Sequence, residues 1–156
     1  MPDKTEKLNQ LLDILGDIYE NRLPFNRLLG LRIVRLVPDQ VRLAFDMAES
    51  LVGNYVQGSL HGGVISSVLD AVGGLTATAG MIQKKMDRPA AEIRQNISRV
   101  GTVDLRIDYL RPGRGDSFQA SASIMRIGNK VAVTRMELHN DQQRLIAVGT
   151  GTYLIS

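Results

Sequence analysis

The pattern of apolar and polar positions divides the chain into a helical N-terminus, a hairpin, one long helix and a series of strands. Residues 4–20 carry apolar side chains at helical spacing, namely Leu8, Leu11, Leu12, Leu15, Ile18 and Tyr19. This pattern predicts an amphipathic helix that ends at Asn21 and Pro24. We expect this helix to cover a sheet edge or a neighbouring subunit, because it is too acidic for a membrane-surface anchor.

A two-residue alternation comes next, which is typical of half-buried strands. Residues 31–37 and 40–47 alternate in this way on either side of Pro38-Asp39, so we predict that the two strands form a hairpin. Residues 48–60 contain several turn-forming residues and are predicted to be a loop that leads into the next helix.

One long apolar helix is predicted from about His61 to Ile82. Its apolar side chains cover a face wide enough for burial against a curved sheet. Gly73, Gly74 and Gly80 each weaken a helix by up to ~1 kcal/mol. Such glycines indicate either close approach of a backbone or ligand, or simple packing of the helix on the sheet.

The remaining chain is predicted to be mostly strand. Strand-like patterns cover residues 92–99, 102–110, 118–127, 130–140 and 145–155, and the first of these is the least regular. In the clearest strand, one predicted face carries Val103, Leu105, Ile107 and Tyr109, and the other carries Thr102, Asp104, Arg106 and Asp108. Short turns join these strands. We therefore predict an α+β fold, in which an antiparallel sheet of five to six strands wraps around the long helix.

Composition narrows the possible functions. The 156 residues suit one domain, and the absence of cysteine excludes disulfides, thiolate metal sites and a cysteine nucleophile. With only His61 and His139, no metal site is expected. The net charge is +3 but aromatic residues make up only 4%, so we do not expect a nucleic-acid partner. The basic excess is typical of a mildly basic surface, and the alternative is that part of it contacts a phosphorylated small molecule. We expect no signal peptide, no membrane span and a cytoplasmic location.

The candidate chemistry lies at the long helix. His61-Gly62-Gly63 opens the helix, and Asp70 follows nine positions after the histidine. An acid on an otherwise apolar helix costs free energy unless it is paired or used. Ser66 and Ser67 are poor nucleophile candidates, because they lack a nucleophile-elbow sequence.

This element order and these motifs resemble the hotdog-fold acyl-CoA thioesterases of the PaaI-like and 4-hydroxybenzoyl-CoA thioesterase type. A second motif agrees, because residues 102–112 resemble the central strand of that family. The resemblance covers roughly residues 25–155. It implies a hotdog thioesterase domain over residues 25–156, preceded by a helical extension over residues 1–24.

The resemblance implies a catalytic role for each matching residue. Asp70 would be the nucleophile or general base that delivers water to the thioester carbonyl group. Gly62 would donate its backbone N–H to the carbonyl oxygen, at a helix N-terminus that favours negative charge. Thr102 would orient the attacking water, and His61 would hold the loop before the helix.

The resemblance also implies substrate-binding residues. The family has an asparagine six residues before the histidine, but here that position is Tyr55, so Asn54 or Gln57 would take its role. Gly63 is a further candidate. No cofactor is expected beyond the coenzyme A of the substrate.

Two arginines are candidates for binding the phosphates of coenzyme A. Arg111 and Arg114 follow the central strand, and arginine suits phosphate by charge and bidentate geometry. A solvated turn explains them equally well.

Helix geometry adds a prediction about assembly. Gly62 and Asp70 lie eight residues apart, about 12 Å along a helix axis. They therefore cannot both touch one carbonyl group from the same helix. If both act in one site, two helices must meet, so we expect a homodimer, and family members commonly pair further into tetramers.

The predicted activity is hydrolysis of an acyl-CoA thioester to the free acid and coenzyme A. Two alternatives remain open: a module that binds acyl-CoA without turnover, and a hotdog enoyl-CoA hydratase or dehydratase. The low aromatic content favours an aliphatic acyl chain. Small residues of the long helix, Gly73, Gly74, Ala77 and Ala79, suggest room for that chain.

Overall fold

The computed structural model describes residues 3–156. The helical elements are α1 (Lys4–Asp17), the π-helical turn η1 (Ile18–Arg22), α2 (Pro24–Leu29), the 3-10 turn η2 (Glu49–Leu51), α3 (Gly62–Lys84) and α4 (Ala90–Ile97). The strands are β1 (Arg32–Val37), β2 (Gln40–Asp46), β3 (Val52–Asn54), β4 (Ser59–Leu60), β5 (Gly101–Tyr109), β6 (Ser117–Ile127), β7 (Val131–Asn140) and β8 (Leu145–Leu154).

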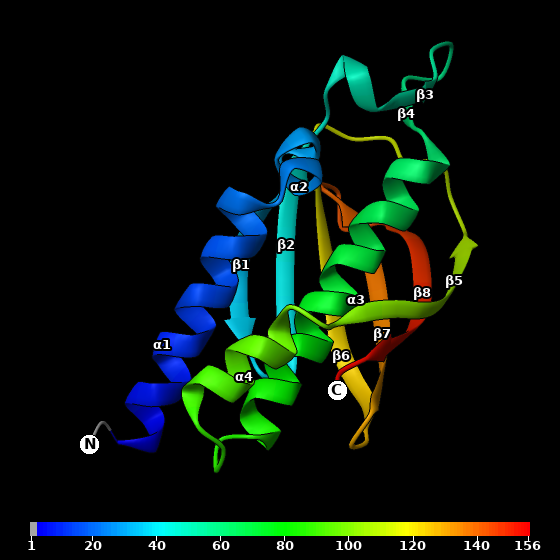
Figure 1. Ribbon diagram of the computed structural model, residues 1–156. Coiled ribbons are helices and arrows are strands. Elements are labelled where there is room, and N and C mark those ends of the chain that lie inside the picture. Colours follow the sequence, from blue (N-terminus) through cyan, green and yellow to red (C-terminus); the bar gives the residue numbers. More distant parts are fainter. Residues whose placement is uncertain (1–2) are drawn as a thin grey trace.

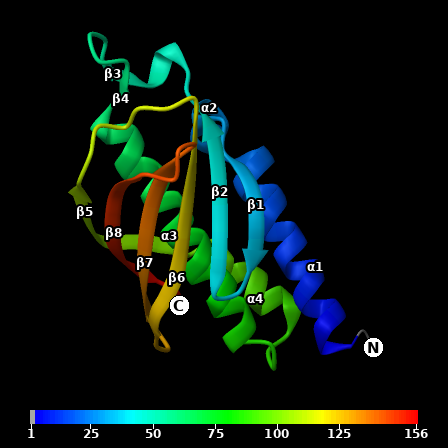
Figure 2. The ribbon, with the colours of Figure 1, turned by 180° about the vertical axis from the view of Figure 1, so that it is seen from behind.

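Six strands form one antiparallel sheet in the order β1-β2-β6-β7-β8-β5. The sheet curves around α3, which crosses its concave face, and α1 lies beside α3 next to β1 (Figure 1). The opposite face of the sheet carries no helix, as the view from behind shows (Figure 2). This arrangement confirms the predicted α+β architecture with one long helix and an additional N-terminal helix.

The core lies between α3 and the sheet. Phe45 of β2 and Phe118 of β6 stack there with ring centroids 5.1 Å apart, and residues 72–82 of α3 are all buried. Among the helices of residues 3–156, α3 is the one that could cross a membrane by length and hydropathy, but 78% of its apolar window is buried inside the protein. That burial is the pattern of a core helix. The predicted stripe of α1 also joins the core, through Leu11, Leu12 and Leu15.

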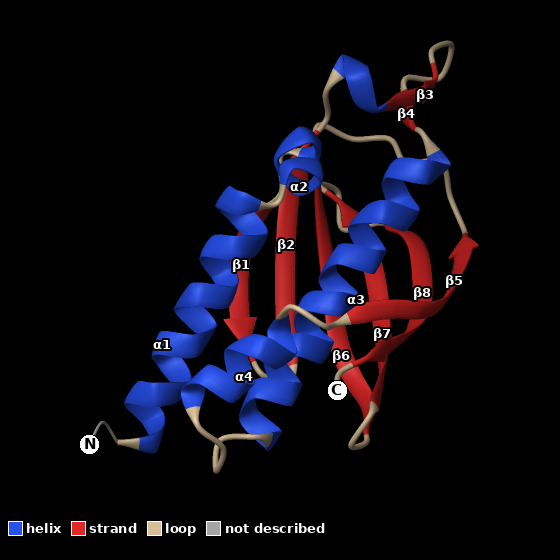
Figure 3. Ribbon diagram, viewed as in Figure 1, coloured by secondary structure: helices blue, strands red, loops and turns tan. Residues whose placement is uncertain are grey.

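Residues 92–99 were predicted to be a strand, and this prediction is wrong. Residues 92–97 belong to helix α4, which follows its N-cap Pro89 and precedes β5, and residues 98–99 form a turn after the helix (Figure 3). Ile93 is buried, and Ile97 packs against the core from the same side, one helical turn later. The intervening Arg94-Gln95-Asn96, which interrupts a strand pattern, is compatible with a helix. The predicted loop over residues 48–60 is also more ordered than expected, because it contains η2 and the β3–β4 hairpin.

The predicted faces of β5 are wrong at its first residues. The register with β8 shifts between Thr102 and Asp104, so one extra residue is accommodated there as a bulge. Thr102 then pairs with Tyr153, and Leu105 pairs with Gly151, two positions earlier on β8. Because residues two apart on a strand share a face, Thr102 lies on the α3 side with Leu105 rather than on the opposite face.

Candidate active site

The N-terminus of α3 presents one free backbone donor. His61 caps the helix, and its Nδ1 accepts a hydrogen bond from the N–H of Gly63 at 2.8 Å. The carbonyl oxygen of His61 accepts from the N–H groups of Val64 and Ile65. Within residues 3–156, the N–H of Gly62 donates no hydrogen bond. This N–H, at the positive end of the helix dipole, is suited to an oxygen that becomes negative.

Neighbouring groups hold this turn in place. The hydroxyl of Tyr109, at the end of β5, donates to the carbonyl oxygen of Gly62 at 3.0 Å. Gly53 lies directly against the backbone of His61, where a Cβ atom would overlap the histidine. The His61 N–H also donates to the carbonyl oxygen of Leu51 at 2.8 Å. The loop and the helix start therefore form one packed unit.

Asp70 lies two turns further along α3 and accepts two hydroxyl groups on one oxygen. Thr102 Oγ1 donates to Asp70 Oδ1 at 2.9 Å, and the Tyr153 hydroxyl lies 3.1 Å from the same Oδ1. The Tyr153 hydroxyl is also 3.1 Å from the backbone carbonyl oxygen of Asp70. In the described part of the chain, no hydrogen bond reaches Oδ2. This second oxygen remains available for chemistry.

A cavity of about 210 Å³ opens at Asp70. Polar side chains line one side of this cavity, namely Asp70, Thr102, Tyr153 and Ser67. The N-terminal segment forms a second wall, with Tyr19, Leu23, Phe25 and Asn26. The remaining lining residues are Ala71, Gly74, Val100 and Gly101. Burial raises the pKa of Tyr19 to about 12. Burial, and then the charge of Asp70, raise the pKa of Tyr153 as well. Both phenols are therefore protonated at neutral pH and can act as donors.

Gly62 opens into a different cavity of about 370 Å³. This second cavity is lined by Ser59, Leu60, Ile65, Tyr109, Leu110, Arg111, Pro112 and Gly113. Within one chain, the structure thus brings Asp70 together with Thr102 but not with Gly62. The Asp70 cavity lies at the start of β5, and the Gly62 cavity lies at its end.

Of the remaining candidates, only Arg111 lines the Gly62 cavity. Asn54 Oδ1 accepts hydrogen bonds from the N–H groups of Val56 and Gln57, both at 3.1 Å, which closes an exposed turn before α3. Arg111 donates from Nη1 to the carbonyl oxygen of Leu145 at 2.9 Å. Arg111 and Arg114 share a groove of about 560 Å³ with the acidic Asp116 and Asp141 and with a third arginine, Arg144.

Ser66 and Ser67 are engaged with the helix backbone. Both hydroxyl groups donate to the carbonyl oxygen of Gly63, at 3.1 and 2.6 Å. Neither serine has the histidine partner that a nucleophile needs, because His61 Nδ1 already accepts from Gly63.

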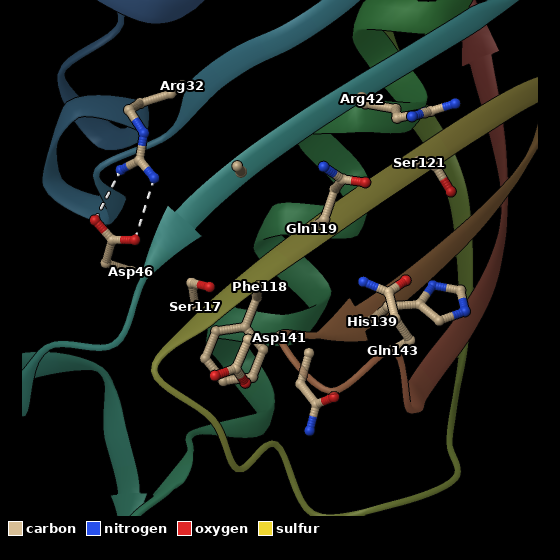
Figure 4. Close-up of a pocket in the computed structure, with 12 residues that line it drawn as sticks. Arg32, Arg42, Asp46, Ser117, Phe118, Gln119, Ser121, His139, Asp141 and Gln143 are labelled. Atoms are coloured by element: carbon tan, nitrogen blue, oxygen red, sulfur yellow. Dashed lines mark hydrogen bonds and ion pairs between the residues drawn. The ribbon is translucent and has the colours of Figure 1, made fainter.

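A larger groove, of about 650 Å³, lies on the outer face of the sheet (Figure 4). It is polar, with a bidentate Arg32–Asp46 ion pair at 3.0 and 3.1 Å on one side and His139 on the other. Neither Asp70 nor Gly62 lines it. The groove is therefore separate from the groups described above, and His139 lies outside the candidate active site.

Comparison with known proteins decides the family. The family model of the thioesterase superfamily matches residues 57–147, which include all of α3 and strands β5, β6 and β7. The chain belongs to the thioesterase superfamily. This membership confirms the predicted hotdog fold and identifies the protein as a thioester hydrolase.

Similar proteins span almost the whole chain. The medium/long-chain acyl-CoA thioesterase YigI of Escherichia coli K12 is 46% identical over 146 residues, which are 94% of each chain. The corresponding protein of Salmonella typhimurium is 47% identical over the same length. A crystal structure from Shewanella oneidensis, described as related to the thioesterase superfamily, is 46% identical with a TM-score of 0.92, and covers 96% of this chain and 97% of its own.

Sequence reasoning missed Tyr153 as a neighbour of Asp70. The two residues are 83 positions apart, and Tyr153 belongs to a strand whose pattern indicates only burial. Glycines at positions 73 and 151, which adjoin the tyrosine in space, were the available signal. The glycines show that space is needed there, but the sequence does not show which side chain fills that space.

Proposed function

We propose that this protein hydrolyses medium- to long-chain acyl-CoA thioesters in a site formed between two subunits. The observation that carries the proposal is the separation of two complementary half-sites in one chain. Asp70, with its available Oδ2, is beside the start of β5, whereas the free N–H of Gly62 is near the end of β5. The names of the similar YigI proteins support the choice of substrate.

The edge strand β5 supplies the means of joining the two half-sites. It pairs with β8 on one side, and its other edge is unpaired in the single chain. In a two-fold dimer, antiparallel pairing of β5 with its copy sets the start of each strand against the end of the other. Thr102 and Asp70 of one subunit would then face Tyr109 and Gly62 of the partner subunit.

Exposed apolar side chains support this dimer. Val103 of β5 is 65% exposed, and Tyr109 and Leu110 at the end of the strand are exposed too. A second exposed group is formed by Tyr55 and Val56 in the turn before α3, and a third by Leu23, Phe25 and Leu28 at α2. When the Gly62 end of one subunit meets the Asp70 cavity of the other, the second and third groups come together and lose their exposure to water.

The proposed mechanism uses the two half-sites together. The thioester carbonyl oxygen accepts a hydrogen bond from the N–H of Gly62 of the partner subunit. Asp70 Oδ2 removes a proton from a water molecule as the water attacks the carbonyl carbon. The N–H stabilises the oxyanion of the tetrahedral intermediate. When the intermediate collapses, the C–S bond breaks and the proton held by Asp70 passes to the leaving sulfur, which gives the free acid and the thiol of coenzyme A. Thr102 holds the carboxylate in place through Oδ1. Direct attack by Asp70, through an anhydride, would use the same oxygen.

The two cavities differ in polarity, and each suits a different part of an acyl-CoA substrate. The apolar walls of the Asp70 cavity, formed by Leu23, Phe25 and Ala71, suit the start of an acyl chain. The Gly62 cavity includes Arg111, which also lines the groove with Arg114 and Arg144. The phosphates of coenzyme A would bind along these three arginines. Asn54 and Gln57, in the turn before α3, would contact the substrate near the carbonyl group.

The first test is release of free thiol from a panel of saturated, aromatic and enoyl-CoA esters. Asp70→Asn keeps the shape of the side chain but removes the base, so we expect kcat to fall by about 100-fold or more with an unchanged melting temperature. Retained activity in this variant would remove Asp70 from the mechanism. Tight binding without hydrolysis across the panel would instead favour a binding module, and hydration of an enoyl-CoA would favour a hydratase.

The second test asks whether the site is shared. Subunits with Asp70→Asn are mixed with subunits with Gly62→Pro, which removes the N–H donor. Each mixed dimer has one intact site, so random exchange should restore roughly a quarter of the wild-type activity from two inactive preparations. A mixture as inactive as its components would show that each site lies within one subunit.

A further inference from the structure

Tyr153 contacts the proposed catalytic acid from the last strand of the sheet. Its side chain is 1% exposed, and its hydroxyl lies 3.1 Å from Asp70 Oδ1. We propose that Tyr153 is a positioning residue for catalysis, which fixes the orientation of the Asp70 carboxylate by donating to Oδ1. This inference rests on the proposed function, because it requires Asp70 to be the base or nucleophile.

The protein provides a shaped space for the phenol. A Cβ atom at Gly151 would lie 2.6 Å from the Tyr153 hydroxyl, and a Cβ atom at Gly73 would overlap that hydroxyl. At Gly74 the added Cβ atom would lie 3.4 Å from the ring. Three glycines from α3 and β8 thus surround the phenol, so the tyrosine cannot shift without a rearrangement of the core. Of the two explanations that the sequence left open for the helix glycines, packing accounts for Gly73, whereas Gly74 adjoins the tyrosine and also lines the Asp70 cavity.

The hydrogen bonds of the phenol orient Asp70. The hydroxyl also lies 3.1 Å from the backbone carbonyl oxygen of Asp70, so it contacts both the side chain and the helix. Thr102 also donates to Oδ1, from the neighbouring strand β5, where it is the cross-strand partner of Tyr153. With both donors on Oδ1, rotation of the carboxylate is restricted, and Oδ2 stays directed towards the atom with which it reacts in the proposed mechanism. Such restriction of a reacting group is an efficient way to lower a barrier.

The electrostatics of the cavity make these donors necessary. Its titratable lining residues are Tyr19 from η1, Asp70 from α3 and Tyr153 from β8, and none of its lining residues is a lysine, arginine or histidine. In this cavity, therefore, hydroxyl donors rather than a cation offset the negative charge of Asp70. Hydrogen bonds to an ionised carboxylate favour the ionised form, which is the form that a base or nucleophile requires.

The experiment compares Tyr153→Phe with the wild-type enzyme over a range of pH. Loss of one hydrogen bond to a charged group should lower kcat by about 10- to 100-fold, with a smaller change in KM. The acid limb of the kcat–pH profile should move to higher pH, because the carboxylate loses a donor that favours its ionised form. A merely structural role would lower the melting temperature but leave the acid limb in place.

Thr76→Val is the matched control. It also deletes one buried hydroxyl, but Thr76 Oγ1 donates to the carbonyl oxygen of Val72 and does not contact Asp70. The control should leave the acid limb where it is in the wild type. If the pH profile and kcat of Tyr153→Phe match those of Thr76→Val, the inference is overturned.

Two further measurements keep the test decisive. If Tyr153→Phe does not fold, a ring-fluorinated tyrosine at this position keeps the hydroxyl and makes it a stronger donor. The acid limb should then move to lower pH, and an unmoved limb overturns the inference. Asp70→Asn separates the two proposals: if that variant remains active, the proposed function fails. If it is inactive while Tyr153→Phe behaves as wild type, only the role of Tyr153 fails.

Discussion

The N–H of Gly62 can be removed without disturbing the helix it begins. Gly62 is the first residue of α3. The N–H of the first helical residue makes no hydrogen bond within the helix, so proline is favoured at this position. His61 has φ −61° and ψ 137°, which is the extended conformation that a residue before proline requires. A Cβ atom at Gly62 would lie 3.4 Å from the ring of Tyr109, an ordinary contact. Gly62→Pro is therefore expected to fold.

The expected result is a large loss of rate with little loss of stability. Removal of one oxyanion donor costs about 100- to 1,000-fold in kcat, or about 2.7–4 kcal/mol of transition-state stabilisation. Stability should stay within about 1 kcal/mol of the wild type, because a compatible proline reduces the entropy of the unfolded chain. Steady-state thiol release gives kcat, and urea unfolding gives the free energy of unfolding.

The matched variant is Gly62→Ala, which adds the same Cβ atom but keeps the N–H. The ratio of the two kcat values isolates the contribution of the hydrogen-bond donor from that of added bulk. If Gly62→Pro and Gly62→Ala have the same kcat, the assignment of the N–H to the thioester oxygen is refuted. If both variants unfold, the conclusion that the first turn tolerates a side chain is refuted instead.

Two further predictions concern assembly and pH. Val103→Lys at the exposed edge of β5 should convert the proposed dimer to folded, inactive monomers, because pairing would bury an unpaired charge. The control is Met125→Lys, which replaces a 62% exposed residue near the end of β6 and should leave the proposed dimer intact. Light scattering measures the mass of both variants. Equal masses for the two variants would contradict pairing through β5. The raised pKa of Tyr19 means that the folded state holds this proton more tightly than the unfolded chain. That contribution to stability is complete below about pH 10 and is lost as the pH rises towards about 12, so the melting temperature of Tyr19→Phe should fall less over this interval than that of the wild type. Parallel declines would exclude Tyr19 as a source of alkaline instability.

Local patterns were sufficient for most of the fold. The apolar stripe of α3, its His61 cap and the alternation of β2 and β6 to β8 reflect interactions within a few residues or across one pair of faces. The short helix α4 was one exception. Eight residues with only two large apolar side chains, Ile93 and Ile97, are compatible with a helix or an irregular strand, and contact with the core decides between them.

The sequence by itself determined the long helix, the antiparallel sheet and the nine-residue spacing between His61 and Asp70. These features follow from periodicity and from a motif contained in one helix. The tertiary structure decided what surrounds Asp70. A bulge in β5 moves Thr102 to the helix side, and closure of the sheet brings Tyr153 across 83 positions to the same carboxylate oxygen. One extra residue in a strand reverses the faces before it, and long-range contacts depend on how the sheet curves, so neither could be deduced from the pattern of the chain alone.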